Sequence, residues 1–287
     1  MLTGILLAIA TGLLWAVCGV VLSCCASRKL AIVPYSILQS FLTGAATLLL
    51  IDFRAITAHD LGILAAFIFL AGFLNSLGLY AVHLAMKRGN HAPVWAISQA
   101  ALIFPFLVGV LFFHNRGNIW QWLGTLLTVA GILTPAAKEF RRISGWFPTA
   151  LAAFFVFGAV QVFYGLPLQL FAFRDAAGMR PLATAWGSTV GWLAIAAYSR
   201  SSIRCDRRTL AVAVAMVLES LISLRLFFLA LDALAAANCE NIAFPLLTGA
   251  NISGFAAYSI FIRHERNSLA DKTGFGLVLA GLVFISL

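Results

Sequence analysis

Long apolar stretches separated by short polar segments dominate this chain. Ten runs can be delimited, each close to the ~20 residues that a helix needs to cross a bilayer. They span residues 2–24, 32–51, 61–84, 92–113, 119–136, 147–168, 181–199, 209–231, 241–262 and 273–287. Backbone polar groups in lipid must be satisfied within a segment, and the alternation typical of a membrane barrel is missing, so the runs predict helices. The expected fold is an all-α integral membrane protein with ten transmembrane helices.

Composition and charge agree with a membrane location. Hydrophobic residues make up 62% of the chain and charged residues 10%, and the mean hydropathy is +0.99. A soluble protein of this size carries more surface charge. The net charge is +9, and the basic residues lie in short loops beside the apolar runs, which favours an anionic lipid surface over nucleic acid as the partner. We expect contact with the lipid bilayer, as in a bacterial inner membrane, and no nucleic-acid partner.

The second half of the sequence repeats the first at an offset of 150 residues. The matching segments are Leu84-Ala85 with Leu234-Ala235, His114-Asn115-Arg116 with His264-Glu265-Arg266, Gly124 with Gly274, and Ala130-Gly131 with Ala280-Gly281. Because a unit of five helices is odd in number, two copies must run in opposite directions through the membrane. Inverted repeats are typical of secondary transporters. We predict a first five-helix repeat over 1–140 and a second over 141–287.

Basic residues are distributed unevenly between the two sets of loops. The loops that follow the first, third, fifth, seventh and ninth runs hold 14 Lys and Arg, whereas the other loops hold 4. Loops rich in Lys and Arg remain in the cytoplasm. The count therefore predicts cytoplasmic odd-numbered loops and both termini outside.

Several short motifs are similar to one family of transporters. The motifs are Leu13-Leu14-Trp15 in the first run, Leu84-Ala85-Met86-Lys87 continuing through Ala92 to Pro105, and Glu265 followed by Gly274 and Ala280-Gly281. They resemble the EamA-like branch of the drug/metabolite transporter superfamily, with Ala16 in place of a glycine and Asn115 in place of the acidic residue in the first half. The resemblance implies ten helices in two repeats, with helices 1, 3, 4, 6, 8 and 9 around a central cavity. It does not identify a substrate.

Two charged residues stand out as candidates for chemistry. Of the 29 charged residues, Glu219 and Arg225 alone fall inside the expected spans. A charge at membrane depth costs ~2.5–3.5 kcal/mol on insertion scales, so both are expected to face a cavity or the interior of the bundle. Arg225 suits a carboxylate, and Glu219 suits an amine or a coupling proton. The alternative is that polar neighbours neutralise each charge and order the bundle.

Other polar or amphipathic residues within the spans extend the candidate substrate site. They are Trp15, Asn75, Tyr80, Gln99, Gln161, Tyr164 and Asn251. Hydrogen bonds between helices, or anchoring at the membrane interface, are the alternative roles. His83 lies one turn from Tyr80 and is a candidate proton relay, although its position near Lys87 and Arg88 also fits a solvated interfacial histidine.

The sequence favours a transporter over two other classes of protein. We expect a secondary transporter that moves a small polar or amphipathic metabolite, such as an amino acid, an amine or a nucleoside, by alternating access. No HExxH, GxSxG or GxxxxGK motif occurs, and the five cysteines have no metal-ligand spacing, so we expect neither enzyme activity, nor a cofactor, nor a bound metal. A membrane-embedded enzyme and a non-transporting scaffold remain the alternatives. The repeated glycines in runs 119–136 and 273–287 offer close-packing faces, either for a homodimer or within the chain.

Overall fold

The chain folds into a bundle of helices. The computed structural model describes residues 1–27, 30–51, 58–113, 118–139, 145–171, 179–203, 205–236, 243–265 and 268–285. No strand occurs among these residues. The expected boundary between the two repeats, at 140 and 141, lies outside the described residues, as does the loop match at His114 to Arg116.

The helices follow the apolar runs of the sequence. They are α1 Leu2–Ala26, α2 Ile32–Leu48, α3 Ala58–Ile63, α4 Leu70–Met86, α5 His91–Gln99, α6 Ile103–Phe112, α7 Ile119–Glu139, α8 Phe147–Phe171, α9 Met179–Ser199, α10 Arg207–Ala235, α11 Ala243–Phe261 and α12 Leu269–Ile285. A π-helical stretch over Leu64–Phe69 joins α3 to α4, and a 3₁₀ turn over Ala100–Leu102 joins α5 to α6. Each expected run therefore falls on one helix or on one contiguous series of helices.

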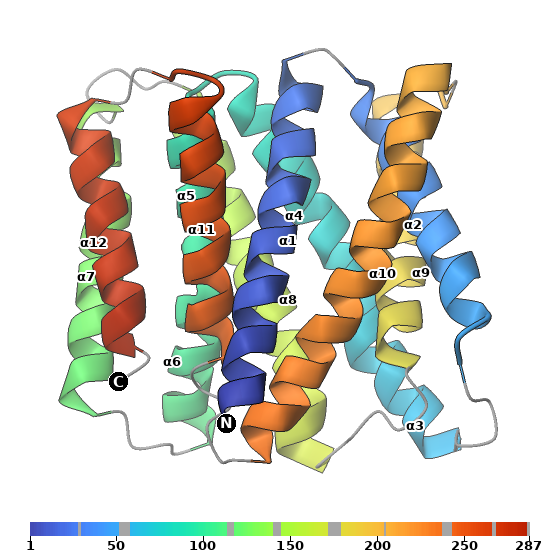
Figure 1. Cartoon of the computed structure of the whole chain (residues 1–287), viewed down its shortest axis with the longest axis horizontal. Helices are drawn as coiled ribbons and strands as arrows, with labels where there is room; N and C mark the ends of the chain where they lie inside the picture. Colours follow the sequence, from blue (N-terminus) through green and yellow to red (C-terminus); the bar gives the residue numbers. More distant parts are fainter. Residues whose placement is uncertain are drawn as a thin grey trace.

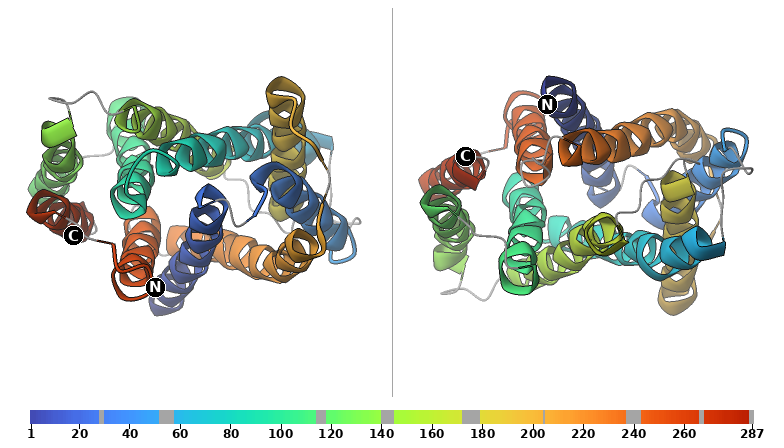
Figure 2. Two further views of the ribbon diagram at one scale, coloured as in Figure 1. Left: turned by 90° about the horizontal axis from the view of Figure 1, so that it is seen from above. Right: turned by 90° about the horizontal axis from the view of Figure 1, so that it is seen from below.

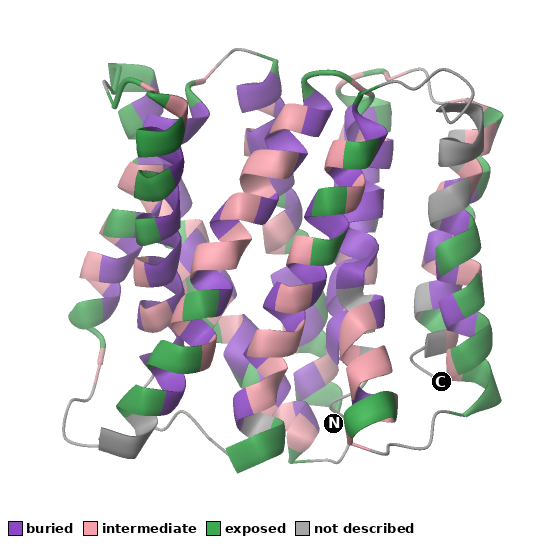
Figure 3. Cartoon of the chain, turned by 180° about the vertical axis from the view of Figure 1, so that it is seen from behind, coloured by how far each residue is buried: buried purple, intermediate pink, exposed green. Residues whose placement is uncertain are grey.

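The protein is a multi-pass membrane protein by the length and apolarity of its helices. Five helical segments are long and apolar enough to span a bilayer: Leu2–Ala26, Leu61–Met86, His91–Phe112, Phe147–Phe171 and Arg207–Ala235. The helices Ile32–Leu48 and Leu246–Phe261 are apolar but shorter. Exposed positions occur along the helices as well as in the loops (Figure 3). Large apolar side chains such as Leu6 and Leu13 of α1 are among the exposed residues. Such a surface suits lipid rather than water.

Successive long helices run up and down through the bundle, so α1 begins and α12 ends at the same end of the molecule (Figure 1). The last turns of α1, α4 and α9 lie at the opposite end (Figure 1). Seen along the helices, α7 and α12 form a pair at one side, and the other helices surround the centre (Figure 2). The centre is thus enclosed by helices from both halves of the sequence.

Small residues bring the helices around the centre into close contact. A Cβ atom on Gly72 of α4 would collide with the carbonyl oxygen of Thr184 on α9, and Gly187 of α9 approaches the carbonyl of Phe69 equally closely. Ser188 Oγ adds a hydrogen bond of 2.9 Å to the Gly72 carbonyl. Such small-residue contacts replace the hydrophobic driving force that is missing between helices in lipid.

The glycine faces of α7 and α12 pack against each other within the chain. A Cβ atom on Gly131 would lie 2.7 Å from the Gly274 carbonyl oxygen and 2.8 Å from Val278 Cγ2. One on Gly281 would lie 2.6 Å from the Gly124 carbonyl oxygen. The structure thus uses these glycines for packing within the chain.

Candidate functional site

A cavity of about 150 Å³ lies at the centre of the helices. It is lined from α1, α2, α4, α5, α8, α9, α10 and α11. The structure brings together at this cavity most of the site residues expected from the sequence: Trp15, Asn75, Gln99, Gln161, Tyr164, Glu219 and Asn251. Residues that are far apart in the chain therefore line the same cavity, and they include both polar and aromatic side chains.

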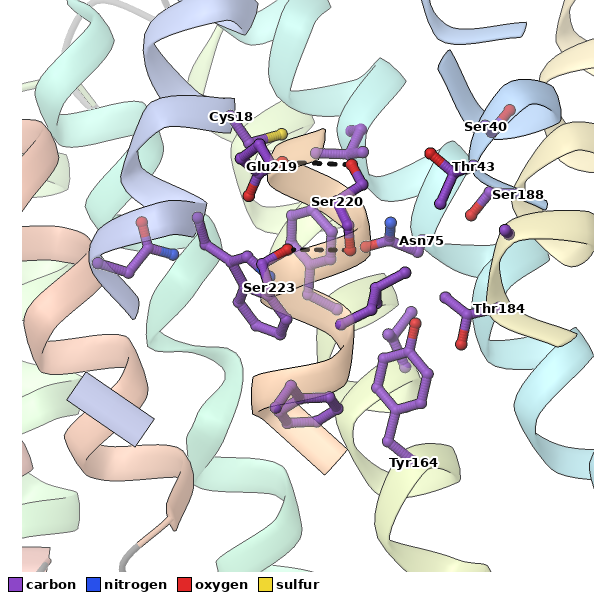
Figure 4. Close-up of a pocket in the computed structure, with 18 of the residues that line it drawn as sticks. Cys18, Ser40, Thr43, Asn75, Tyr164, Thr184, Ser188, Glu219, Ser220 and Ser223 are labelled. Atoms are coloured by element: carbon purple, nitrogen blue, oxygen red, sulfur yellow. Dashed lines mark hydrogen bonds between the residues drawn. The ribbon is translucent and has the colours of Figure 1, made fainter. Parts of the chain in front are cut away.

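Glu219 is the charged residue of the cavity wall among the described lining residues. Its Oε2 accepts a hydrogen bond of 3.2 Å from Ser220 Oγ, which in turn accepts one from Gln39 Nε2. Ser223 Oγ donates to the Ser220 carbonyl one turn further along α10, and these side chains lie together in Figure 4. Glu219 Oε1 is buried and has no hydrogen-bond partner among the described residues. One carboxylate oxygen is therefore free to receive a donor from a bound solute.

An amide ladder forms the wall between α5 and α11. Trp95 Nε1 donates to Asn251 Oδ1 at 3.1 Å, and Asn251 Nδ2 donates to Gln99 Oε1 at 3.1 Å. Asn251 is 1% exposed and Gln99 is 8% exposed. The 3₁₀ turn over Ala100–Leu102 begins directly after Gln99. Broken helices at a buried polar wall are typical of binding sites in membrane transporters.

Aromatic rings cover another part of the wall. Phe227 packs against Trp15 at 5.2 Å and against Tyr164 at 5.4 Å between ring centroids. Gln161 Oε1, one turn before Tyr164 on α8, is buried and has no hydrogen-bond partner among the described residues. The cavity thus combines ring faces with unpaired acceptors, the mixture that small organic ligands require.

Sequence analysis missed a polar stripe on α2 and α9. The missed polar lining residues of these two helices are Gln39, Ser40, Thr43, Thr184 and Ser188. The last four are labelled on α2 and α9 in Figure 4. Gln39 was detectable as a glutamine inside an apolar run. The Ser and Thr residues were not detectable, because their hydroxyl groups can donate a hydrogen bond to a carbonyl of their own helix wherever they face. Thr43 Oγ1, for example, donates to the Gln39 carbonyl oxygen at 2.8 Å.

Arg225 differs from the sequence expectation. It lies on α10 but its side chain is exposed and does not line the cavity. Its neighbours on that face are the exposed Leu218, Ile222 and Leu229. Glu219 and Arg225 are about 120° apart around a helix, so only one of them can face the centre. Asn75 of α4, in contrast, lines the cavity as expected.

Tyr80 and His83 lie outside the central cavity. Tyr80 packs edge-on against Trp192 and stacks on His83 at 6.4 Å. His83 is 4% exposed, so the solvated interfacial position suggested by Lys87 and Arg88 is incorrect. The histidine instead borders a second cavity nearer the end of α4.

A buried ion pair was also missed. Arg180, assigned to a loop from the sequence, lies in the first turn of α9, is 2% exposed and pairs with Asp232 of α10 at 2.5 Å. The guanidinium also lies 4.5 Å from the centre of the Phe228 ring. Arg180 directly precedes the apolar run 181–199, and Asp232 directly follows the run 209–231, so both were left outside the expected spans. Buried charge in the helices is therefore not confined to Glu219.

Metal chemistry finds no support in the part of the chain that the structure describes. No group of three or more His, Cys, Asp and Glu residues lies close enough there to hold an ion. Cys18, Cys24, Cys25 and Cys205 are free thiols. The polar groups that the described residues offer to the central cavity are hydrogen-bonding side chains and one carboxylate.

Comparisons with known proteins agree with a transporter fold. The model of the EamA-like transporter family, a family of the drug/metabolite transporter superfamily, matches residues 2–134. A solved structure titled only "Crystal structure of protein" is similar over 99% of this chain and 98% of that chain, with a TM-score of 0.64 and 12% sequence identity. No curated protein matches the chain. At this identity the solved structure supports the fold alone.

Proposed function

We propose that the protein is a secondary transporter with its substrate site in the central cavity, because the EamA-like transporter family model matches residues 2–134 and the cavity lies among the helices of both halves. A small polar or amphipathic metabolite would bind there and cross by alternating access between two inverted repeats. The observation that carries the proposal is the buried Glu219 carboxylate with one unpartnered oxygen in a cavity walled by both halves of the chain. We place the protein in a bacterial inner membrane on the same grounds.

Helix packing supports two related halves, taken here as 1–140 and 141–287. Helix α1 of the first half packs on α10 and α11 of the second half. Helix α8 of the second half packs on α4 and on the α5–α6 segment of the first half. Likewise α2 packs on α10, and α9 packs on α4. Exchanging each helix for its counterpart 150 residues away reproduces this set of neighbours. α1 and α8 also run in opposite directions through the bundle (Figure 1), as inverted repeats require.

The size and charge of the cavity narrow the substrate. Its 150 Å³ is smaller than the ~300–1,000 Å³ of sites for drug-sized ligands. A cavity of this volume holds a molecule about the size of a single ring. Glu219 is negative when ionised, and no Lys or Arg is among the described lining residues. We therefore favour amines and small amino acids over nucleosides.

Reconstitution in liposomes tests the proposal. A panel of radiolabelled amines, amino acids and nucleosides should include at least one solute that accumulates in vesicles with the protein and not in empty vesicles. Glu219→Gln keeps the shape of the side chain and removes its charge, so uptake of that solute should fall by at least about tenfold.

Arg225→Gln is the matched control, because it removes a charge from the same helix outside the cavity. Its uptake should stay close to that of the unmodified protein. Transport through this site is rejected if no solute in the panel moves, or if the two variants lose uptake equally.

A further inference from the structure

A second cavity lies between the central cavity and one end of the bundle. It has a volume of about 570 Å³ and forms where α1, α4 and α9 end and α2 and α10 begin. Its lining includes the exposed residues Ala31, Lys87, Ser202 and Asp206. It therefore opens toward the polar loops at the top of Figure 1, like a vestibule. We call it the vestibule below.

The same helices line the vestibule and the central cavity. On each helix one residue faces the central cavity and another, further toward the loops, faces the vestibule. The pairs are Cys18 and Cys25 on α1, Gln39 and Pro34 on α2, Leu79 and His83 on α4, and Ser220 and Thr209 on α10. The two cavities thus lie one behind the other along a common axis.

The layer that separates them is thinnest along α4 and α2. Leu79 and His83 are four positions apart, a rise of ~6 Å, and Pro34 and Gln39 are five positions apart, a rise of ~7.5 Å. The pairs on α1 and α10 are seven and eleven positions apart, rises of ~10.5 Å and ~16.5 Å. Buried side chains lie at the levels between the paired residues: Leu22 is 3% exposed, Tyr35 is 4% exposed and Met216 is 5% exposed. One to three helical turns therefore separate the two cavities.

Each of the three buried residues lies one helical turn from a residue that lines the central cavity. Tyr35 lies four residues before Gln39 on α2, and Leu22 lies four residues after Cys18 on α1. Met216 lies four residues before Ser220 on α10. Residues four apart share a face of a helix, so all three lie on the cavity side of their helices, displaced toward the vestibule.

A network of hydrogen bonds joins α1, α5 and the residues after α11 at the same end of the bundle. Glu265, beyond the end of α11, accepts hydrogen bonds from the backbone of His91 and Ala92 at the start of α5. Arg263 joins the network to α1 through hydrogen bonds of 3.0 Å to Ser23 and Ser27. A route between α1, α5 and α11 would have to break these bonds, whereas Leu22 and Met216, beside Tyr35 in the layer between the cavities, have apolar side chains.

We propose that Leu22, Tyr35 and Met216 form a closed gate, and that the solute passes between the central cavity and the vestibule when the gate opens. The passage of a solute through this gate rests on the proposed transport function. The gate itself is a property of the packing and can be tested without a solute. A Met side chain suits such a layer because it adopts several shapes at low cost.

Thiol labelling from one side of the membrane tests the gate. With Cys24, Cys25, Cys205 and Cys239 replaced by Ser, Cys18 is the single reporter of the central cavity. In a background with Cys18 also replaced by Ser, Ala31→Cys reports on the vestibule. A membrane-impermeant cationic methanethiosulfonate, added from the side of the loop after α1, should modify Ala31→Cys at least about tenfold faster than Cys18. Equal rates would overturn the proposal.

Gate variants complete the test in the Cys18 reporter protein. Tyr35→Ala and Leu22→Ala, each checked for folding by size-exclusion chromatography, should raise the rate of Cys18 modification from that side toward the rate of Ala31→Cys. Tyr35→Phe keeps the ring and should leave Cys18 protected. Protection of Cys18 in every folded alanine variant would show that these residues do not form the barrier. Such a failure would leave solute uptake in liposomes, and hence the proposed function, unaffected.

Discussion

Glu265 concentrates more hydrogen bonds than any other single carboxylate discussed above. Besides the hydrogen bonds from two backbone N–H groups of α5, its carboxylate accepts one of 2.6 Å from Ser259 Oγ and one of 2.9 Å from Arg263 Nε. Burial opposes its ionisation, but the Ser259 hydrogen bond, followed by the charges and N–H groups around it, outweighs burial and lowers the pKa of Glu265. A carboxylate at the start of α5 also complements the helix dipole.

This carboxylate predicts acid-sensitive stability. Its pKa is lower in the folded protein than in the unfolded chain, so its stabilising contribution is complete above the unfolded value of about 4.3 and is lost as the pH falls through the folded value. Glu265→Gln should lower the thermal midpoint in detergent at pH 7 by at least about 3 °C, and the difference from the unmodified protein should shrink below about pH 4. Thermal melts followed by fluorescence across that pH range measure both. A difference that is the same at every pH would rule out ionisation of Glu265 as its source.

At the scale of helices, α7 and α12 depend on glycine for their contact. A methyl group at position 281 would collide with Thr128 and lie 2.6 Å from the Gly124 carbonyl oxygen, whereas one at position 276 meets nothing within 4 Å. Gly281→Ala should therefore lower stability. Gly276→Ala on the same helix should be neutral or stabilising by about 0.5–1 kcal/mol, because alanine favours a helix over glycine. Thermal melts should show a lower midpoint for Gly281→Ala and an unchanged or higher midpoint for Gly276→Ala, and equal losses would contradict the packing.

The helices could be predicted from the sequence more fully than the site. Every apolar run forms helix, because the bilayer leaves the backbone no other way to satisfy its hydrogen bonds. Glu219 was found because a charge stands out against an apolar background. Arg225 stands out equally, and only the packing of α10 decides which of the two faces the cavity. Ser40 and Ser188 carry no such signal, since a serine on an apolar helix looks the same in a cavity or in a tight contact.

Across the whole molecule, the distribution of basic residues predicts the orientation in the membrane. The helices α1, α4 and α9 end at one end of the bundle, and α1 begins and α12 ends at the other (Figure 1). The odd-numbered loops hold 14 Lys and Arg against 4 in the others, and Lys and Arg keep loops in the cytoplasm. The vestibule would then face the cytoplasm, and both termini would face outside.

Reporter fusions check this orientation. An enzyme active only in the periplasm, fused after Leu287 in a bacterial host, should be active, and the same enzyme inserted between Ser201 and Ser202 should be inactive. A reporter active only in the cytoplasm should give the reverse pattern at both positions. Because the two positions lie at opposite ends of the bundle, activity of one reporter at both would contradict the helix count, whereas exchange of the two signals would contradict only the orientation. In that second case the gate at Tyr35 would separate the central cavity from the outside rather than from the cytoplasm.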